Sequence, residues 1–162
     1  MLRQLMWSAK TGDQDFLAMM QDFVKSYTNK NASTEDFREV VNRHMKPDLD
    51  LQHNGRADWF FREWVYGSEI PRYHFEYSLA PGDQGKVMLT GKVTQSGVST
   101  NFVMPVPVYA DFDGNMVRLG SVALQGNQTS KEFKVMLPKK PKRLLVNAHH
   151  DVLAAENTVS GN

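Results

Sequence analysis

The 162-residue chain contains no cysteine. This absence excludes a disulfide-stabilised scaffold, thiolate zinc sites and cysteine nucleophiles. The chain also carries little net charge, because 19 Lys and Arg residues stand against 18 Asp and Glu residues. A formal charge of +1 provides no general attraction for phosphates or anionic lipids. We therefore do not expect nucleic acid as a partner.

Long apolar runs and low-complexity segments are missing as well. No run approaches the roughly 18 apolar residues of a membrane span, and the first residues are not followed by the apolar core of a signal peptide. With 41% hydrophobic residues, 11 Gly and 7 Pro, the composition is that of a globular protein. We expect a soluble chain without a membrane span, folded as one ordinary domain or two small ones.

The first part of the chain has helical periodicity. Apolar residues recur at steps of three and four, which places them on one side of a helix. Ser33 and Asp36 resemble a capping box at the start of one helix, Pro47 stops that helix, and Gly67 fits the end of the next. The expected helical segments are residues 1–9, 13–28, 33–46 and 57–66.

After Pro71 the pattern changes to the period of two that is typical of β-strands. Turn residues such as Gly82, Gly97 and Gly114 separate the strands. Pro105 and Pro107 are expected at a sheet edge or a bulge. The expected strands are residues 73–79, 87–95, 103–112, 116–124, 132–137 and 143–146.

The change near residue 70 predicts an α+β chain of two segments. Residues 1–70 are expected to form antiparallel helices, and residues 71–157 an all-β, immunoglobulin-like sandwich of about six or seven strands. Residues 158–162 (Thr-Val-Ser-Gly-Asn) are expected to be a tail.

The histidines do not form a recognisable metal motif. A zinc peptidase needs two histidines one helical turn apart, as in H-E-x-x-H, and the sequence has no such pair. His149 and His150 are adjacent, so on a strand they would point to opposite faces, and with Asp151 they read as a polar loop. His44 reads as a core or rim histidine, and His53 as a solvated loop residue.

The paired acids are better explained by turns and loops than by chemistry. Asp111 and Asp113 resemble the start of a calcium loop, but Gly114 comes too early, so a hairpin turn is expected. Asp48 and Asp50 follow a proline in a polar connection, where a solvated loop is the default.

Two further clusters have a structural and a functional interpretation. Lys139, Lys140, Lys142 and Arg143 are favoured as a soluble sheet edge over an anion-binding site. The aromatic segment 59–66 is favoured as the packed seam of a helical layer over a surface that stacks on sugars or peptides.

Several short motifs, taken in order, resemble the gluzincin zinc aminopeptidases, which are metallopeptidases of the membrane alanyl aminopeptidase type. The resemblance covers essentially the whole chain. It depends on the order of these segments: Met1-Leu2-Arg3, Gly12-Asp13, Phe23-Val24, Ser33-Thr34-Glu35-Asp36-Phe37, Trp59-Phe60-Phe61-Arg62-Glu63-Trp64-Val65-Tyr66-Gly67, Ile70-Pro71, Phe102 to Val108, Leu137 to Pro141, and Asn147.

The resemblance implies that residues 1–70 correspond to the end of a thermolysin-like catalytic domain. In this family the zinc ligands, the general base and the other catalytic groups lie upstream of such a segment, so no catalytic, cofactor-binding or metal residue is assigned here. The chain is then a C-terminal fragment that is inactive alone, with zinc only in the parent enzyme. Its role would be to support the catalytic domain and to shape substrate access for peptide hydrolysis.

The resemblance also implies partners. These are the upstream catalytic domain of the same parent chain, the peptide substrate of that parent, and a second copy bound through the exposed helical face. The parent is expected to be periplasmic, secreted or membrane-associated, and the compartment stays open.

Two other functions remain open from the sequence. One is an autonomous β-sandwich that binds protein or carbohydrate through a concave, aromatic face. The other is an enzyme that uses Asp48, Asp50 or His53 in a closed pocket with perturbed acids and histidines. The fragment hypothesis instead predicts an exposed apolar surface on the opening helices.

Overall fold

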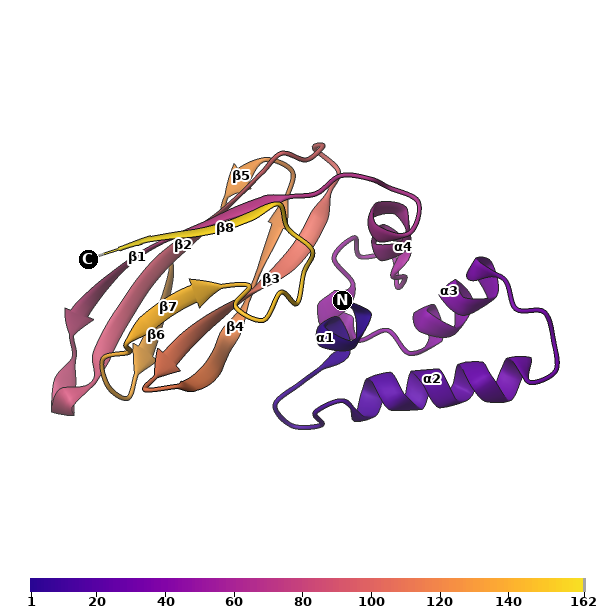
Figure 1. Ribbon diagram of the computed structural model, residues 1–162, viewed down its shortest axis with the longest axis horizontal. Helices are drawn as coiled ribbons and strands as arrows, with labels where there is room; N and C mark the ends of the chain where they lie inside the picture. Colours follow the sequence, from indigo (N-terminus) through magenta and orange to yellow (C-terminus); the bar gives the residue numbers. More distant parts are fainter. Residues whose placement is uncertain (162) are drawn as a thin grey trace. The chain divides into compact units, whose positions relative to one another are not determined.

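The structure, a computed structural model, describes residues 1–161, except for the side chain of Asp48. The described chain divides into two compact units, Met1–Ser68 and the residues from Glu69 onward (Figure 1). The first is helical and the second is made of β-strands, so the chain is α+β, as predicted. We call them the helical unit and the β unit.

The helical unit follows the predicted order, and its first, third and last helices are shorter than predicted. Trp7 is extended, which ends the first helix. The predicted capping box is present: the N–H of Asp36 donates to the Ser33 hydroxyl at 3.1 Å, and the N–H of Ser33 donates to the Asp36 carboxylate at 2.9 Å. The elements are α1 (Leu2–Met6), α2 (Gln14–Tyr27), α3 (Thr34–Arg43), the 3-10 turn η1 (Pro47–Leu49) and α4 (Asp58–Trp64).

Aromatic side chains form the centre of the helical unit. The ring of Phe37 on α3 meets Phe23 on α2 and Phe61 on α4 edge to face, with centroids 5.0 and 6.1 Å apart. Trp59 is buried, and its indole N–H donates to the carbonyl of Leu49 at 3.0 Å. The first part of the predicted aromatic seam is therefore packed. Its last residues, Val65 and Tyr66, are exposed.

A charged contact fastens α2 to the end of α3. The carboxylate of Asp22 on α2 lies 2.9 Å from His44 Nε2 and 3.0 Å from the Arg43 guanidinium. Hydrogen bonds from His44, Arg43 and Ser26 lower the pKa of Asp22 to about 2. Asp22 therefore stays ionised over the whole physiological range.

The β unit contains two sheets. One has the order β5-β2-β1-β8 with β6 also paired to β2, and the other has the order β4-β3-β7 (Figure 1). Both sheets contribute fully buried side chains, such as Phe75 and Leu89 from the first and Met104 and Val106 from the second. The strands are β1 (Arg72–Pro81), β2 (Val87–Ser96), β3 (Val103–Phe112), β4 (Asn115–Gln125), β5 (Gln128–Thr129), β6 (Phe133–Leu137), β7 (Arg143–Val146) and β8 (Glu156–Gly161).

The predicted tail over residues 158–162 is wrong for the described residues. Residues 156–161 form β8, which pairs in parallel with β1. His74 on β1 bridges two hydroxyls of β8, with 2.7 Å from Nδ1 to Thr158 and 3.0 Å from Nε2 to Ser160. The strand is polar and is held by main-chain pairing with β1. Its sequence therefore lacks the apolar alternation that would predict a strand. Asn162 lies outside the described residues.

The two prolines of β3 lie in a central strand, not at an edge. The N–H of Asn147 donates to the carbonyl of Pro107 at 2.8 Å, so Pro107 turns its main chain toward the β7 side. β7 pairs only with residues 108–111 of β3, so the missing N–H of Pro107 breaks no ladder bond. The expected bulge is close by, because the β3–β4 register shifts between Val108 and Tyr109.

Replacing a side chain by Ala should affect the stability of the helical unit differently on the two sides of α2. Met19 is fully buried, so Met19→Ala should lower the free energy of unfolding of the helical unit by about 2–5 kcal/mol. Leu17 is 54% exposed, so Leu17→Ala, the matched control, should change it by less than about 0.5 kcal/mol. All three tryptophans lie in the helical unit, so urea unfolding followed by tryptophan fluorescence measures this unit selectively. Equal losses would contradict the placement of α2.

Candidate functional site

Helix α2 has more apolar surface than its neighbours cover. At about 100° per residue its apolar side chains spread over about 160° of the helix circumference. Of these side chains only Met19 is buried, whereas Leu17 is 54% and Val24 is 60% exposed. The apolar residues of the helix are Phe16, Leu17, Met19, Met20, Phe23, Val24 and Tyr27.

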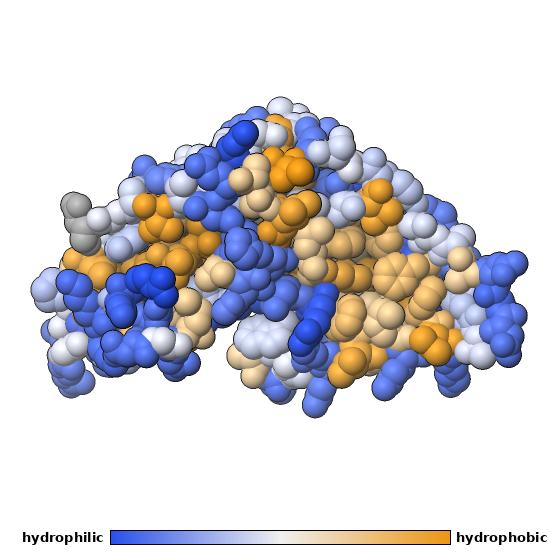
Figure 2. Space-filling view, viewed as in Figure 1, coloured by the Kyte–Doolittle hydropathy of each residue, from blue (hydrophilic) through white to orange (hydrophobic). Residues whose placement is uncertain are grey.

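The uncovered part is a continuous stripe. Leu17 and Val24 are two turns apart on the same side of α2, and the half-buried Met20 lies between them. We call these three residues the open face of α2. Figure 2 shows apolar side chains gathered on the surface of the helical unit. A stripe of this spacing is the kind of surface that packs against another helix.

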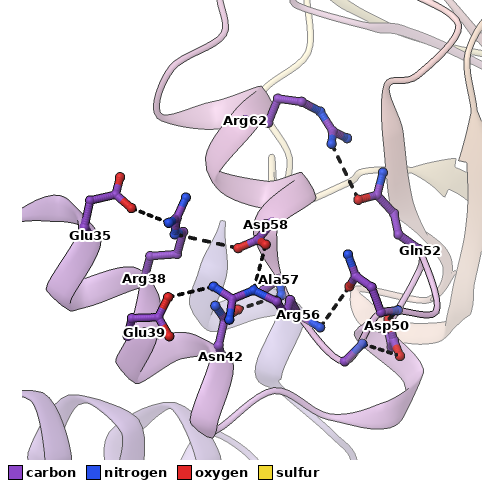
Figure 3. Close-up of polar contacts among 12 residues, drawn as sticks. Glu35, Arg38, Glu39, Asn42, Asp50, Gln52, Arg56, Ala57, Asp58 and Arg62 are labelled. Atoms are coloured by element: carbon purple, nitrogen blue, oxygen red, sulfur yellow. Dashed lines mark hydrogen bonds and ion pairs between the residues drawn. The ribbon is translucent and has the colours of Figure 1, made fainter.

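The loop before α4 uses its acid to hold its own backbone. The carboxylate of Asp50 accepts hydrogen bonds from the N–H groups of Asn54 at 2.9 Å and Gly55 at 3.1 Å (Figure 3). His53 lies in the same turn, is exposed and has a φ of 53°. The side chain of Asp48 lies outside the described residues. Asp50 therefore works as a turn-forming group, and nothing brings His53 to it as a catalytic partner.

An ion-pair network fastens this loop to α3 and α4 (Figure 3). The guanidinium of Arg56 lies 2.8 Å from Asp58 and 2.6 Å from Glu39, and Arg38 is paired with Glu35 and lies 3.7 Å from Asp58. The hydrogen bond from Arg56 lowers the pKa of Asp58, and Asp58 and Glu39 raise the pKa of Arg56. Each charge has a partner of the opposite sign, which is the arrangement of a structural network.

The predicted histidine positions are not brought together. His44 contacts Asp22 in the helical unit, and His149 and His150 are exposed in the loop after β7. No group of three His, Cys, Asp or Glu side chains in the described part of the chain could hold a metal. The residues present therefore do not fit the zinc of the aminopeptidases.

The β unit contains a buried contact between Tyr109 and Asp151 that the sequence does not predict. The hydroxyl of Tyr109 on β3 donates to the buried carboxylate of Asp151, and the ring of His149 meets the Tyr109 ring edge to face at 5.0 Å. Burial, and then the hydrogen bond to Asp151, raise the pKa of Tyr109. No sequence signal links residues 42 positions apart, and the contact anchors the loop between β7 and β8.

The second acidic pair forms the predicted hairpin turn between β3 and β4. Asp111 accepts the N–H of Gly114 at 2.7 Å and pairs with the Arg143 guanidinium at 2.8 Å, which lowers the pKa of Asp111. Asp113 pairs with Lys139 at 3.0 Å. Two members of the basic cluster thus neutralise the turn instead of forming an anion site.

The β unit has a groove of about 620 Å³ beside β4. One wall is residues 119–123 of β4, and the other is residues 128–133. The apolar side chains that line it include Val108, Val122, Phe133 and Val135. Phe133 is the single aromatic ring in this lining and Glu132 the single acid, so the groove matches neither an aromatic sugar platform nor a pocket of clustered acids.

Among the described residues no helix has the length and apolar character to cross a membrane.

Comparison with protein families and with curated proteins adds no relative. No protein-family model matches the sequence, and no curated protein matches it. The proposed function therefore depends on the open face of α2 and on the order of short motifs.

Because the described His, Asp and Glu side chains form no group of three that could hold a metal, we predict that the chain binds no structural or catalytic zinc. After zinc loading and removal of free metal, elemental analysis should find well below one zinc per chain, and aminoacyl-anilide substrates should not be hydrolysed. Stoichiometric zinc that is lost in a His149→Ala, His150→Ala double variant would instead assign a metal site to the loop after β7.

Proposed function

We propose that this chain is a non-catalytic structural module of a gluzincin-type zinc aminopeptidase. The helical unit completes a thermolysin-like catalytic domain, and the β unit is an immunoglobulin-like sandwich that orients neighbouring domains and shapes substrate access. The observation that carries the proposal is the open face of α2. The order of short motifs supports the choice of family.

The open face supplies the driving force for docking. Burying a Leu or Val side chain completely stabilises an association by about 1.5–3 kcal/mol. Leu17 and Val24 are both more than half exposed, and Met20 adds to the same stripe. A partner helix laid along α2 would bury all three at once, because they repeat every three to four residues. The proposed occupant is the remainder of the catalytic domain.

The polar groups support a scaffold role. Asp50 holds a turn, Asp22 joins two helices, and Arg56 is held between two carboxylates. Each of these groups is satisfied by the fold itself. The chemistry of peptide hydrolysis belongs, in this proposal, to zinc ligands in the rest of the enzyme.

The test is binding to a separately produced gluzincin aminopeptidase catalytic domain that lacks its own C-terminal segments. Sedimentation velocity should detect a one-to-one complex with the full chain. The double variant Leu17→Gln, Val24→Gln should weaken this complex by at least about tenfold, because two apolar side chains lose their buried contacts. Both positions are exposed, so the variant should unfold at nearly the wild-type urea concentration.

Leu153→Gln is the matched control, because Leu153 is also 54% exposed but lies in the β unit. This variant should bind like the wild type. No complex with the wild type, or equal binding by the double variant, would contradict the proposal. A dimer of the chain that the double variant converts to a monomer would assign the open face to a second copy instead.

A further inference from the structure

Strand β4 is a long sheet edge with little protection against pairing. It has 11 residues and, within the described chain, pairs only with β3. Arg118 is its one charged residue, and it contains no proline. Proteins usually protect such an edge with lysines, prolines or short strands. The other edge strands here, β5, β6, β7 and β8, have two to six residues.

The contacts of Pro107 show which groups of β4 face outward. Pro107 turns its main chain toward β7, so its neighbours Val106 and Val108 turn theirs toward β4. Their partners on β4 are Val122 and Gly120. The alternating residues of β4, Ser121 and Ala123, therefore direct their N–H and C=O groups to the free edge.

The groove lies along this free edge. Successive residues of a strand point to opposite faces, so a cavity that touches five consecutive residues, 119–123, follows the edge and not one face. At about 3.3 Å per residue, these residues offer about 17 Å of main chain. The opposite wall is also a consecutive run, residues 128–133.

We infer that the β unit binds an extended peptide, which adds to β4 as a further strand. Ser121 and Ala123 supply the main-chain hydrogen bonds, and Val122, Phe133 and Val135 contact apolar side chains at alternate positions of the peptide. The proposal goes beyond the docking of the helical unit and depends only on residues of the β unit.

The shape of the groove favours a single extended chain over a second copy of the protein. Residues 128–133 stand beside the edge of β4, because both line the same cavity. Two paired strands lie about 4.8 Å apart, so the β4 edges of two copies could meet only if both 128–133 walls moved aside. A lone peptide strand enters between the walls without this cost.

The probe is a fluorescein-labelled peptide with the sequence Lys-Val-Thr-Val-Thr-Val-Lys, measured by fluorescence anisotropy with the full chain. Ala123→Pro removes one outward N–H, and its partner on β3, Pro105, lies outside the ladder hydrogen bonds. We expect this variant to bind at least about tenfold more weakly, because a donor is lost and the ring blocks the peptide. Ala123→Val keeps the N–H and should bind within about twofold of the wild type.

A second measurement leaves the protein unchanged. N-methylation of the three valines, or alternatively of the two threonines, blocks one edge of the peptide while its side chains remain. One of these two peptides should lose binding and the other should keep it. No binding of the unmodified peptide, or equal binding of both methylated forms, would overturn the proposal. So would a dimer of the chain that Ala123→Pro dissociates, because the edge would then pair with a second copy.

Discussion

The helical unit depends on one constraint, the mismatch between the apolar arc of α2 and the area that α1 and α3 cover. Met19 is fully buried, and Phe23 on the same helix meets Phe37 on α3 edge to face. Beyond Met20 the arc continues onto Leu17 and Val24, which the described elements leave 54% and 60% exposed. Apolar area drives both folding and association, so the helix that contributes the buried Met19 to the core also presents an apolar surface to a partner.

The β unit has a different kind of excess: β4 presents main-chain hydrogen-bonding groups at a free sheet edge. β3 is paired on both sides, with β4 along its length and with β7 over residues 108–111. β4 is satisfied on one side, and its free edge lies in a groove with apolar lining. In both units charged side chains are paired with groups of the opposite charge. Arg56 pairs with Glu39 in the helical unit, and Arg143 pairs with Asp111 in the β unit. The chain thus offers apolar and main-chain surfaces for binding, and its described ionised groups serve mainly to hold loops and turns.

Local patterns predicted the elements well. The helix over 13–28, the capping box at Ser33 and the hairpin turn at Asp113 all depend on neighbours in sequence, and all are present. Pairing between distant segments was predicted poorly. The sequence predicts a tail where β8 lies, because a polar strand held by main-chain pairing has no apolar alternation. The sequence predicts an edge or a bulge for the prolines of β3, and it does not reveal locally that the short β7 leaves them free of ladder bonds in a central strand.

The candidate sites show the same limit. The apolar residues of α2 are evident from the sequence, but which of them stay uncovered depends on how α1 and α3 pack. The groove depends on which strand is left at the edge of its sheet, and this is a property of the whole topology. The absence of an H-E-x-x-H motif, in contrast, can be read directly from the sequence without knowledge of the fold.

Hydroxyl-radical footprinting of α2 tests the central claim most directly, because the rate of side-chain oxidation reports side-chain exposure. In the chain alone, Leu17, Met20 and Val24 should be oxidised readily and Met19 slowly. With the aminopeptidase catalytic domain bound, oxidation of the three open-face residues should fall at least severalfold, while Leu153 in the β unit keeps its rate. Unchanged oxidation of Leu17 and Val24 in the complex would contradict the claim that the open face of α2 is the docking surface.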